Sequence, residues 1–186
     1  MGALYSGWAM RKKPLPRLWL ITDQRNDAVL ERALAALPRG SGVIYRHYHL
    51  AGPERLARFR ALRRAARARG HVVVLADSAL TAREWGADGI YGAPRALVPR
   101  RAGVLHLATA HNAHEIALAN RLGAHAVLLS PVFATRSHPG GKSLGPVRFR
   151  LAARLARVPV IALGGMTYAR ARALDWPCWA AIDGLS

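Results

Sequence analysis

The sequence predicts an α/β protein, a (β/α)8 barrel of the TIM-barrel type in an abbreviated form. Eight short apolar runs recur along the 186-residue chain, and helical patterns lie between most of them. Short runs that are apolar throughout and rich in β-branched residues are typical of parallel strands covered on both faces. Regular alternation of strand and helix indicates right-handed βαβ units, and eight such units suffice to close a barrel.

The predicted strands are four to six residues long, and most carry Val, Ile or Leu at consecutive positions. In chain order they are LWLIT (18–22), GVIYR (42–46), HVVVL (71–75), DGIY (88–91), GVLHLA (103–108), HAVLLS (125–130), VPVIAL (158–163) and WAAI (179–182).

Helical periodicity fills most of the intervals between these strands. The hydroxyl groups of Ser78 and Thr167 stand where they can cap two of the helices. The predicted helices cover residues 27–37, 53–69, 78–85, 113–122, 148–156 and 167–174.

The chain is shorter than the roughly 250 residues typical of this fold. Residues 93–102, with two prolines, connect strands four and five, so the fourth helix is expected to be reduced. The sequence stops directly after strand eight, so the last helix is expected to be absent. We expect a basic flexible N-terminal arm at residues 1–17 and a single barrel domain at residues 18–186. An open doubly wound sheet of five or six strands is the alternative fold.

A formal net charge of +18 predicts an anionic partner, either phosphorylated small molecules or nucleic acid. Seven arginines lie in ERLARFRALRRAARAR (54–69). They can equally form the solvated face of an amphipathic helix that buries Leu56, Phe59, Leu62 and Ala66. Aromatic residues that could stack on bases do not interleave with these arginines, which makes nucleic-acid binding the less favoured interpretation.

The remaining composition excludes several classes of protein. A single cysteine, Cys178, excludes an intramolecular disulfide and a multi-cysteine zinc site. No apolar run approaches the roughly 18 residues of a membrane helix, so no membrane association is expected. At the N-terminus the positive charges follow the apolar residues, the reverse of a secretory signal, and a cytoplasmic location is therefore expected.

A long polar loop, SPVFATRSHPGGKSLGP (130–146), follows the sixth predicted strand. In such barrels the chemistry lies at the carboxyl ends of the strands, so this loop is placed for ligand contact. The hydroxyl groups of Thr135 and Ser137 can donate to anionic oxygens, and His138, when protonated, and Lys142 add positive charge. We expect phosphate binding here, and an ordinary solvent-exposed loop is the alternative.

Other polar residues end strands at the same edge. Gly164 and Gly165 follow strand seven and precede the start of a helix, where barrels often bind phosphate through backbone N–H groups. A tight turn without a ligand is the alternative. The remaining residues at this edge are Asp23, Arg46, Asp77, Thr109, His111, Asp183 and Gly184.

Taken in order, several segments resemble the family of thiamine-phosphate synthase and its relative, the thiazole tautomerase. The resemblance covers residues 18–186, and the strand-five histidine, the SPVFAT loop and PVIALGG are its most specific parts. It implies a (β/α)8 barrel. For the synthase it implies condensation of a pyrimidine diphosphate with a thiazole phosphate, with magnesium as cofactor and pyrophosphate as product. The segments are LWLITD (18–23), VIYR (43–46), LAD (75–77), GADGIYG (86–92), ATAH (108–111), GAHAVLLSPVFATRSH (123–138), LGP (144–146) and VPVIALGGM (158–166).

The resemblance also implies roles for individual residues. Arg46 would grip the pyrophosphate and thereby act in catalysis, and Asp77 would be a magnesium ligand. Thr109 would lie beside the pyrimidine. Thr135 and Ser137 would bond phosphate oxygens, and Gly165 would donate its N–H to the thiazole phosphate.

The chain departs from the synthase pattern at several of these positions. Arg-Glu-Lys becomes Arg46, His47 and Tyr48, and no Asp or Glu lies between Asp88 and Glu115 to serve as a second magnesium ligand. A loop lysine is replaced by His138, and Asp183 stands where a serine is expected.

Three hypotheses follow from these observations. The first is a synthase with an altered diphosphate site and a weakened magnesium site. The second is a metal-independent thiazole tautomerase in which His111 moves the proton, because histidine titrates near neutral pH; helix capping or packing is the alternative role of His111. The third is a non-catalytic barrel that binds phosphate ligands or nucleic acid. A homo-oligomer, in which a neighbouring chain covers the end of the barrel near residue 186, is compatible with each of them.

Overall fold

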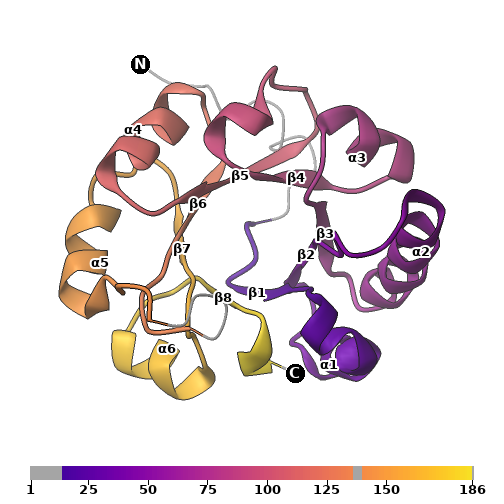
Figure 1. The fold of residues 1–186 in the computed structure, drawn as a ribbon, viewed down its shortest axis with the longest axis horizontal. Helices are drawn as coiled ribbons and strands as arrows, with labels where there is room; N and C mark the ends of the chain where they lie inside the picture. The colour runs from indigo at the N-terminus through magenta and orange to yellow at the C-terminus, as the bar shows by residue number, and fades with distance from the viewer. Residues whose placement is uncertain (1–13, 136–139, 186) are drawn as a thin grey trace.

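Eight parallel strands close into a barrel in sequence order, surrounded by a ring of helices (Figure 1). The computed structural model describes residues 14–135 and 140–185. The ring closes between the first and last strands, where Leu18 pairs with Trp179 and Leu20 with Ala181. The predicted fold class is therefore confirmed, and the open sheet is excluded.

Each predicted strand is found within two residues of its expected bounds. The strands are β1 (Leu18–Ile21), β2 (Gly42–Tyr45), β3 (Val72–Leu75), β4 (Gly89–Gly92), β5 (Leu105–Ala110), β6 (Ala126–Leu129), β7 (Val160–Ala162) and β8 (Trp179–Ala181).

The predicted helices are also present, and the fourth is reduced as expected. Only the 3-10 turn η3 (Pro94–Leu97) stands between β4 and β5, and the described residues after β8 hold the 3-10 turn η4 (Asp183–Leu185). The other helices are η2 (Gln24–Val29), α1 (Leu30–Ala36), α2 (Gly52–Ala68), α3 (Ala79–Trp85), α4 (Ala113–Arg121), α5 (Gly145–Ala153) and α6 (Tyr168–Leu174).

Two helix starts use the expected side chains. The hydroxyl of Ser78 accepts from Thr81 N at 3.1 Å, and that of Thr167 accepts from Arg170 N at 3.2 Å. Both bonds satisfy N–H groups that a helix start otherwise leaves without partners.

The strands separate two hydrophobic cores, because their side chains alternate between the faces of the sheet. Trp19, Ile44 and Leu107 belong to the core inside the barrel, whereas Leu20 and Val43 pack under the helices. Trp19 fills the base of the interior, where its indole N–H donates to Pro16 O at 2.7 Å.

Residues 14–17 run along the base of the barrel. Arg17 O accepts from Trp179 N at 2.9 Å, and Leu15 packs against the interior core. Most of the arm expected at residues 1–17 lies outside the described residues, so the domain boundary stays a prediction.

Helix α2 buries Phe59, Leu62 and Ala66, as its periodicity predicts. The expectation that its arginines all face solvent is wrong for two of them. The side chains of Arg55 and Arg58 are only 12% and 22% exposed, and they pair with Asp77 and Asp27 respectively. These guanidinium groups therefore join α2 to the carboxyl edge of the barrel.

Candidate active site

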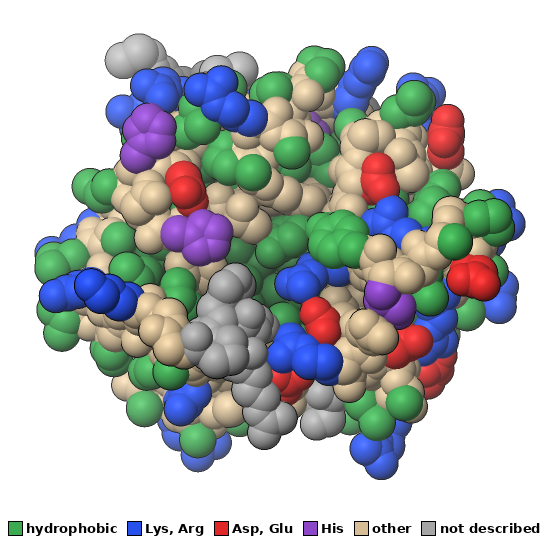
Figure 2. Space-filling model, viewed as in Figure 1, with side chains coloured by type: hydrophobic (Ala, Val, Ile, Leu, Met, Phe, Trp, Pro, Cys, Tyr) green, Lys and Arg blue, Asp and Glu red, His purple; other side chains and the backbone are tan. Residues whose placement is uncertain are grey.

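A cavity of about 890 Å³ opens at the carboxyl ends of the strands. We call it the mouth. In Figure 2, hydrophobic side chains form the floor of a central hollow, and basic and acidic side chains alternate beside it. Six strands or their following loops contribute to its lining: Arg46 after β2, Tyr91 in β4, His111 after β5, Thr135 and Lys142 after β6, Gly164 and Gly165 after β7, and Asp183 after β8.

The structure brings together eight of the residues singled out from the sequence: Arg46, His111, Thr135, Lys142, Gly164, Gly165, Asp183 and Gly184. Asp77 follows β3 and Thr109 lies near the end of β5, at the same edge of the barrel, but neither lines this cavity. Ser137 and His138 lie outside the described residues, so their roles stay predictions.

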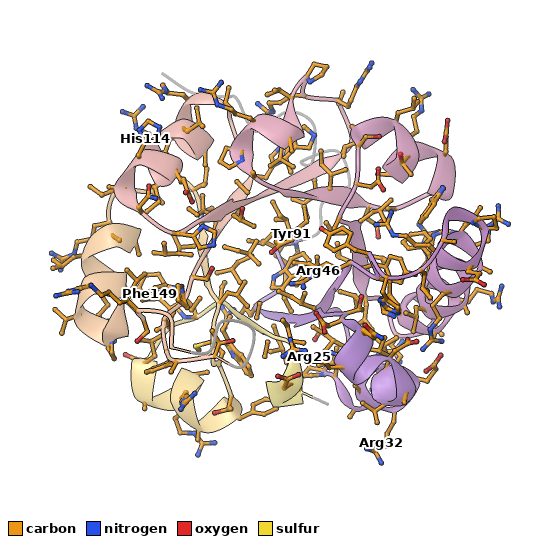
Figure 3. All side chains as sticks on the ribbon, viewed as in Figure 1. Arg25, Arg32, Arg46, Tyr91, His114 and Phe149 are labelled. Atoms are coloured by element: carbon orange, nitrogen blue, oxygen red, sulfur yellow. The ribbon has the colours of Figure 1, made fainter. Side chains whose placement is uncertain are left out.

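Arg46 enters the mouth from the end of β2 and is held from behind (Figure 3). Its backbone N–H donates to the Thr22 hydroxyl at 3.0 Å, and its Nη2 donates to Asp23 Oδ2 at 3.0 Å. Its buried Nε has no hydrogen-bond partner among the described residues. A buried N–H without an acceptor is unfavourable, so this guanidinium is suited to donate to an anionic ligand oxygen.

Tyr91 lies beside Arg46 inside the ring of strands (Figure 3) and was not selected from the sequence. Burial raises the pKa of its hydroxyl, and the nearby Arg46 guanidinium partly offsets that effect. Tyr91 therefore stays a neutral hydroxyl at physiological pH. The alternation of side chains along β4 could have identified Tyr91 as an interior residue, and it does pack against the interior core.

The two glycines after β7 are required by close backbone packing. Gly164 has φ +97°, and an added Cβ would lie 2.6 Å from Pro131 Cα. At Gly165, with φ +61°, the Cβ would lie 2.4 Å from Ala134 O. Because Phe133 N also donates to Gly164 O at 3.1 Å, the loops after β6 and β7 form one unit.

Arg170 adds a further cation to the mouth in addition to Arg46 and Lys142, and sequence reasoning missed it. Its Nη1 donates to Gly165 O at 2.5 Å, and its guanidinium lies 5.0 Å from the centre of the Phe133 ring. Helical spacing could have identified Arg170 in the sequence, because it lies three residues after the capping residue Thr167 at the start of α6. These contacts hold a positive charge beside the glycine turn.

Carboxylates alternate with the cations along one side of the mouth. Arg25 lies 2.8 Å from Asp23 and 3.5 Å from Asp183. Burial opposes ionisation of Asp23, but hydrogen bonds from Arg25 and the charges of Arg25 and Arg46 outweigh it and lower the pKa of this carboxyl. An incoming anion therefore meets guanidinium groups whose charge is partly balanced.

His111 lies at the rim of the mouth, before the capping residue Asn112 of α4. Its Nδ1 is 2.9 Å from Glu115 Oε2, and its side chain is 55% exposed. A carboxylate behind an accessible imidazole orients the ring, an arrangement suited to proton transfer.

The sequence model of the family described as thiamine monophosphate synthase matches residues 18–175. The chain belongs to this family.

Two relatives share this assignment. A thiamine-phosphate synthase from Chloroflexus aurantiacus is 30% identical over 168 residues, covering 83% of this chain and 76% of that protein. A putative thiamine-phosphate synthase 2 from Aquifex aeolicus is 35% identical over 60 residues, 32% of each chain.

Solved structures agree with the fold. A thiamine phosphate pyrophosphorylase from Pyrococcus furiosus superposes with a TM-score of 0.73 at 22% identity, over 89% of this chain and 85% of that one. One from Bacteroides thetaiotaomicron gives a TM-score of 0.59 at 16% identity, over 89% and 82% of the two chains. At these identities the likeness supports the barrel alone.

The thiamine-phosphate synthase family implies magnesium, and the residues around Asp77 do not fit a bound metal ion in this conformation. Asp77 Oδ2 accepts from Arg55 Nη1 at 2.6 Å, and Oδ1 accepts from Ser78 N at 2.7 Å. Arg55 also donates to the carbonyl oxygens of Arg46 and Ala76. The fixed guanidinium occupies the place beside the carboxylate that a cation would take, so Asp77 as a metal ligand stays a prediction that requires Arg55 to move.

Asp27, His47 and His49 form another group in which metal-ligating atoms lie within 4.8 Å of one another. His47 is buried, and its ring bonds Thr22 Oγ1 at 2.7 Å and Asp27 Oδ1 at 2.8 Å. Arg58 also bonds this carboxylate oxygen at 2.8 Å. Both ring nitrogens of His47 and one carboxylate oxygen of Asp27 thus have partners without a metal, and the group anchors the end of β2.

Proposed function

We propose that this protein is a thiamine-phosphate synthase that joins hydroxymethylpyrimidine diphosphate to thiazole phosphate and releases pyrophosphate. One observation carries the proposal most. In a chain that belongs to the thiamine monophosphate synthase family, Arg46 lines the same cavity as Thr135 and Gly165, and its buried Nε–H has no hydrogen-bond partner among the described residues.

The two phosphorylated substrates are assigned to opposite sides of the mouth. Arg46 takes the diphosphate, because a guanidinium can donate two parallel hydrogen bonds to phosphate oxygens. Thr135, Gly164, Gly165 and Arg170 take the thiazole phosphate, with Ser137 and His138 as further predicted donors. Thr109 shares the strand parity of the interior residues Leu105 and Leu107, which supports its place under the pyrimidine.

In the proposed reaction, the bond between the pyrimidine methylene carbon and the diphosphate oxygen breaks, and the electron pair leaves with pyrophosphate. The thiazole nitrogen then donates its lone pair to the cationic methylene carbon. The protein aligns the two reactants and stabilises the negative charge that develops on the leaving group. We assign no step to a metal held by Asp77, since Arg55 already neutralises that carboxylate.

The geometry at His111 favours a second candidate, a thiazole tautomerase. The accessible His111 beside Glu115 can take a proton from one position of a thiazole ring and return it at another. This reaction needs no metal, so the occupied surroundings of Asp77 would not affect it. A barrel without catalytic activity that keeps phosphate binding is the third candidate.

The decisive experiment incubates the purified chain with both precursors and follows thiamine phosphate and pyrophosphate by chromatography. We expect condensation by the wild type and a loss of at least about 100-fold in Arg46→Gln, because one charge-assisted contact contributes about 1.5–3 kcal/mol and more in the transition state. Arg32→Gln, on the outer surface (Figure 3), is the matched control.

The alternatives predict different outcomes of that assay. The tautomerase would replace the synthase if the wild type gave no condensation but exchanged solvent protons into a thiazole carboxylate phosphate. His111→Gln should then abolish this proton exchange. Absence of both activities with phosphate binding retained would leave the non-catalytic barrel.

The location of the protein in the cell and its binding partners are proposed from the sequence. None of the described helices is long and apolar enough to span a membrane. The cytoplasmic location, the homo-oligomer and the less favoured nucleic-acid binding remain predictions from the sequence.

A further inference from the structure

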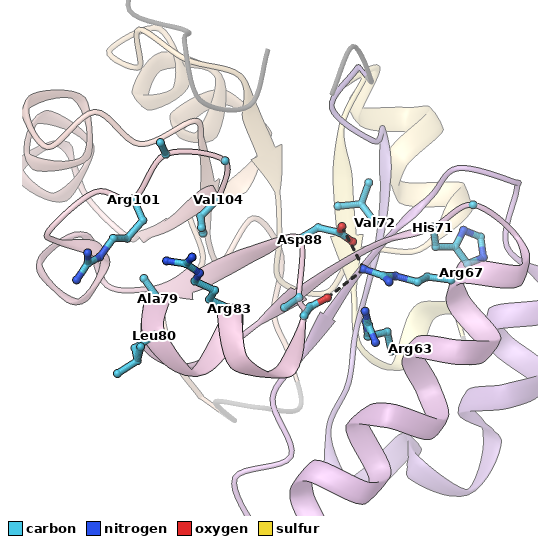
Figure 4. Close-up of a pocket in the computed structure, with 15 residues that line it drawn as sticks. Arg63, Arg67, His71, Val72, Ala79, Leu80, Arg83, Asp88, Arg101 and Val104 are labelled. Atoms are coloured by element: carbon cyan, nitrogen blue, oxygen red, sulfur yellow. Dashed lines mark hydrogen bonds and ion pairs between the residues drawn. The ribbon is translucent and has the colours of Figure 1, made fainter. Parts of the chain in front are cut away.

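A second cavity, of about 1020 Å³, lies at the opposite end of the barrel from the mouth. We call it the base cavity (Figure 4). Its walls come from α2, from α3 and from the segments that lead into β3, β4 and β5. Four arginines line it: Arg63, Arg67, Arg83 and Arg101.

Asp88 is the one carboxylate among the described residues that line the base cavity. Arg67 takes up much of its charge, with Nη2 at 3.7 Å from Asp88 Oδ1 and a hydrogen bond to Gly86 O at 3.0 Å (Figure 4). The other carboxylate oxygen accepts from Val73 N at 2.9 Å. The base cavity therefore carries an excess of positive charge.

Arg63 is the most constrained of these cations. Its Nε is buried and has no hydrogen-bond partner among the described residues. Its guanidinium packs on Gly86, where an added Cβ would lie 2.7 Å from Nη2. Burial, followed by the charge of Arg67, lowers the pKa of Arg63. An unpaired guanidinium in this position is unfavourable, and a bound anion would offset that cost.

We propose that the base cavity binds a small polyphosphate anion, such as inorganic triphosphate or the triphosphate group of a nucleotide. The side chains of Arg63, Arg83 and Arg101 form no hydrogen bond or ion pair with the described residues, so their guanidinium groups remain available for phosphate oxygens. The planar fork of arginine matches phosphate geometry and suits it to polyanions.

The shape of the site favours a small anion over nucleic acid. The arginines enclose a concavity whose volume is at the upper end of the range of small-molecule sites, about 300–1,000 Å³. Its described lining has no Phe, Tyr or Trp side chain for base stacking, and the ring of His71 is buried against the chain. Because the lining residues precede or flank the amino ends of the strands, the anion would bind far from the proposed substrates and act as an effector.

The test is calorimetric titration of the full chain with inorganic triphosphate and, separately, with ATP. The variant Arg63→Gln/Arg83→Gln removes two charges from the base cavity. The matched control, Arg60→Gln/Arg64→Gln, removes two charges from exposed positions of α2 that do not line it. Thermal unfolding of each variant verifies that it is folded.

We expect the first double variant to weaken triphosphate binding at least tenfold and the control to change it less than about twofold, because Arg63 and Arg83 line the base cavity whereas Arg60 and Arg64 do not. Arg46→Gln should leave this binding unchanged, which separates the base cavity from the mouth.

Stronger binding of ATP than of triphosphate would identify a nucleotide as the ligand of the base cavity. Equal losses in both double variants, or no binding by the wild type, would overturn the proposal, and loss only in Arg46→Gln would move the anion to the mouth. A preference for single-stranded DNA over triphosphate would favour nucleic acid instead.

Discussion

The mouth and the base cavity of the barrel both gather guanidinium groups, but they treat the charge differently. At the mouth, Arg25 and Arg46 each contact a carboxylate, and Asp23 is shared between them. At the base, Arg63 and Arg83 have no such partner among the described residues. In a chain with a net charge of +18, the number of cations therefore says little about where ligands bind, and the pairing of each cation says more.

The largest expected difference between the two ends concerns backbone packing. Gly164→Ala at the mouth should lower the free energy of unfolding by about 4 kcal/mol, from left-handed backbone strain and from the clash with Pro131. At the base, Gly103 has φ +75°, but nothing lies within 4 Å of an added Cβ. Gly103→Ala should therefore lower the free energy of unfolding by only about 1 kcal/mol. Urea denaturation of both variants measures this, and equal losses would contradict the packing argument.

The second largest effect is expected from acid, which should lower the free energy of unfolding through two buried histidines on the base side of the barrel. Burial is the main cause that lowers the pKa of His106 to about 4, with contributions from His125 and Arg100. Burial, then the charge of Arg100, also lowers the pKa of His125 to about 4. Between the ordinary pKa near 6.5 and pH 4, the unfolded chain takes up protons that the folded chain refuses, so stability falls as the pH falls.

For one histidine this change amounts to about 3 kcal/mol between pH 7 and pH 4. Both ring nitrogens of His106 are buried and have no hydrogen-bond partner within the described part of the chain, so His106→Leu should flatten the profile while keeping stability at pH 7. Urea unfolding across this pH range measures the slope. His114→Leu, an exposed change on α4, is the control (Figure 3). An unchanged slope in His106→Leu would contradict the assignment.

Removing the cation beside Asp77 tests the pairing at the mouth edge. Burial raises the pKa of Asp77, but the hydrogen bond and charge of Arg55 outweigh it and lower that pKa overall. Arg55→Met should leave the carboxylate without its cation and strengthen Mn²⁺ binding about tenfold, because a carboxylate is a preferred oxygen ligand for hard cations.

Electron paramagnetic resonance of free Mn²⁺ gives this affinity without reference to activity. Arg60→Met, an exposed change on the same helix, should leave it unaltered. Equal Mn²⁺ binding in the wild type and Arg55→Met would mean that Arg55 does not exclude the metal.

The smallest effect is expected for the carboxylate across the mouth. Asp183→Ser removes a negative charge from the lining and should strengthen pyrophosphate binding by about threefold, a modest gain because the residue is exposed. Titration at two salt concentrations checks this, since the gain should shrink at high salt. Weaker binding in Asp183→Ser would show that this carboxylate supports the site through its contact with Arg25.

The barrel could be predicted because its strands are buried on both faces. Runs such as VVVL and AVLL leave few alternatives to parallel strands, and their ends then bring Arg46, Thr135 and Gly165 to one edge. Residue type and strand order were sufficient for these placements.

Side chains that turn back from helices could not be placed from the same patterns. Arg55 lies 22 residues before Asp77, and its charge indicated solvent exposure. Its position four residues before Phe59, on the face of the buried stripe, was the available signal. The base cavity depends on how α2, α3 and the segment before β5 pack together, which no local pattern specifies.

The close packing around Trp19 has a spectroscopic consequence. Its indole is fully buried against Gly42, where an added Cβ would lie 2.1 Å from the ring, and its N–H is bound to Pro16 O. Such an indole emits from a rigid and dry environment, so its fluorescence should be shifted to short wavelength and resist quenching by iodide. This gives the protein an intrinsic optical reporter of whether the ring of strands is shut.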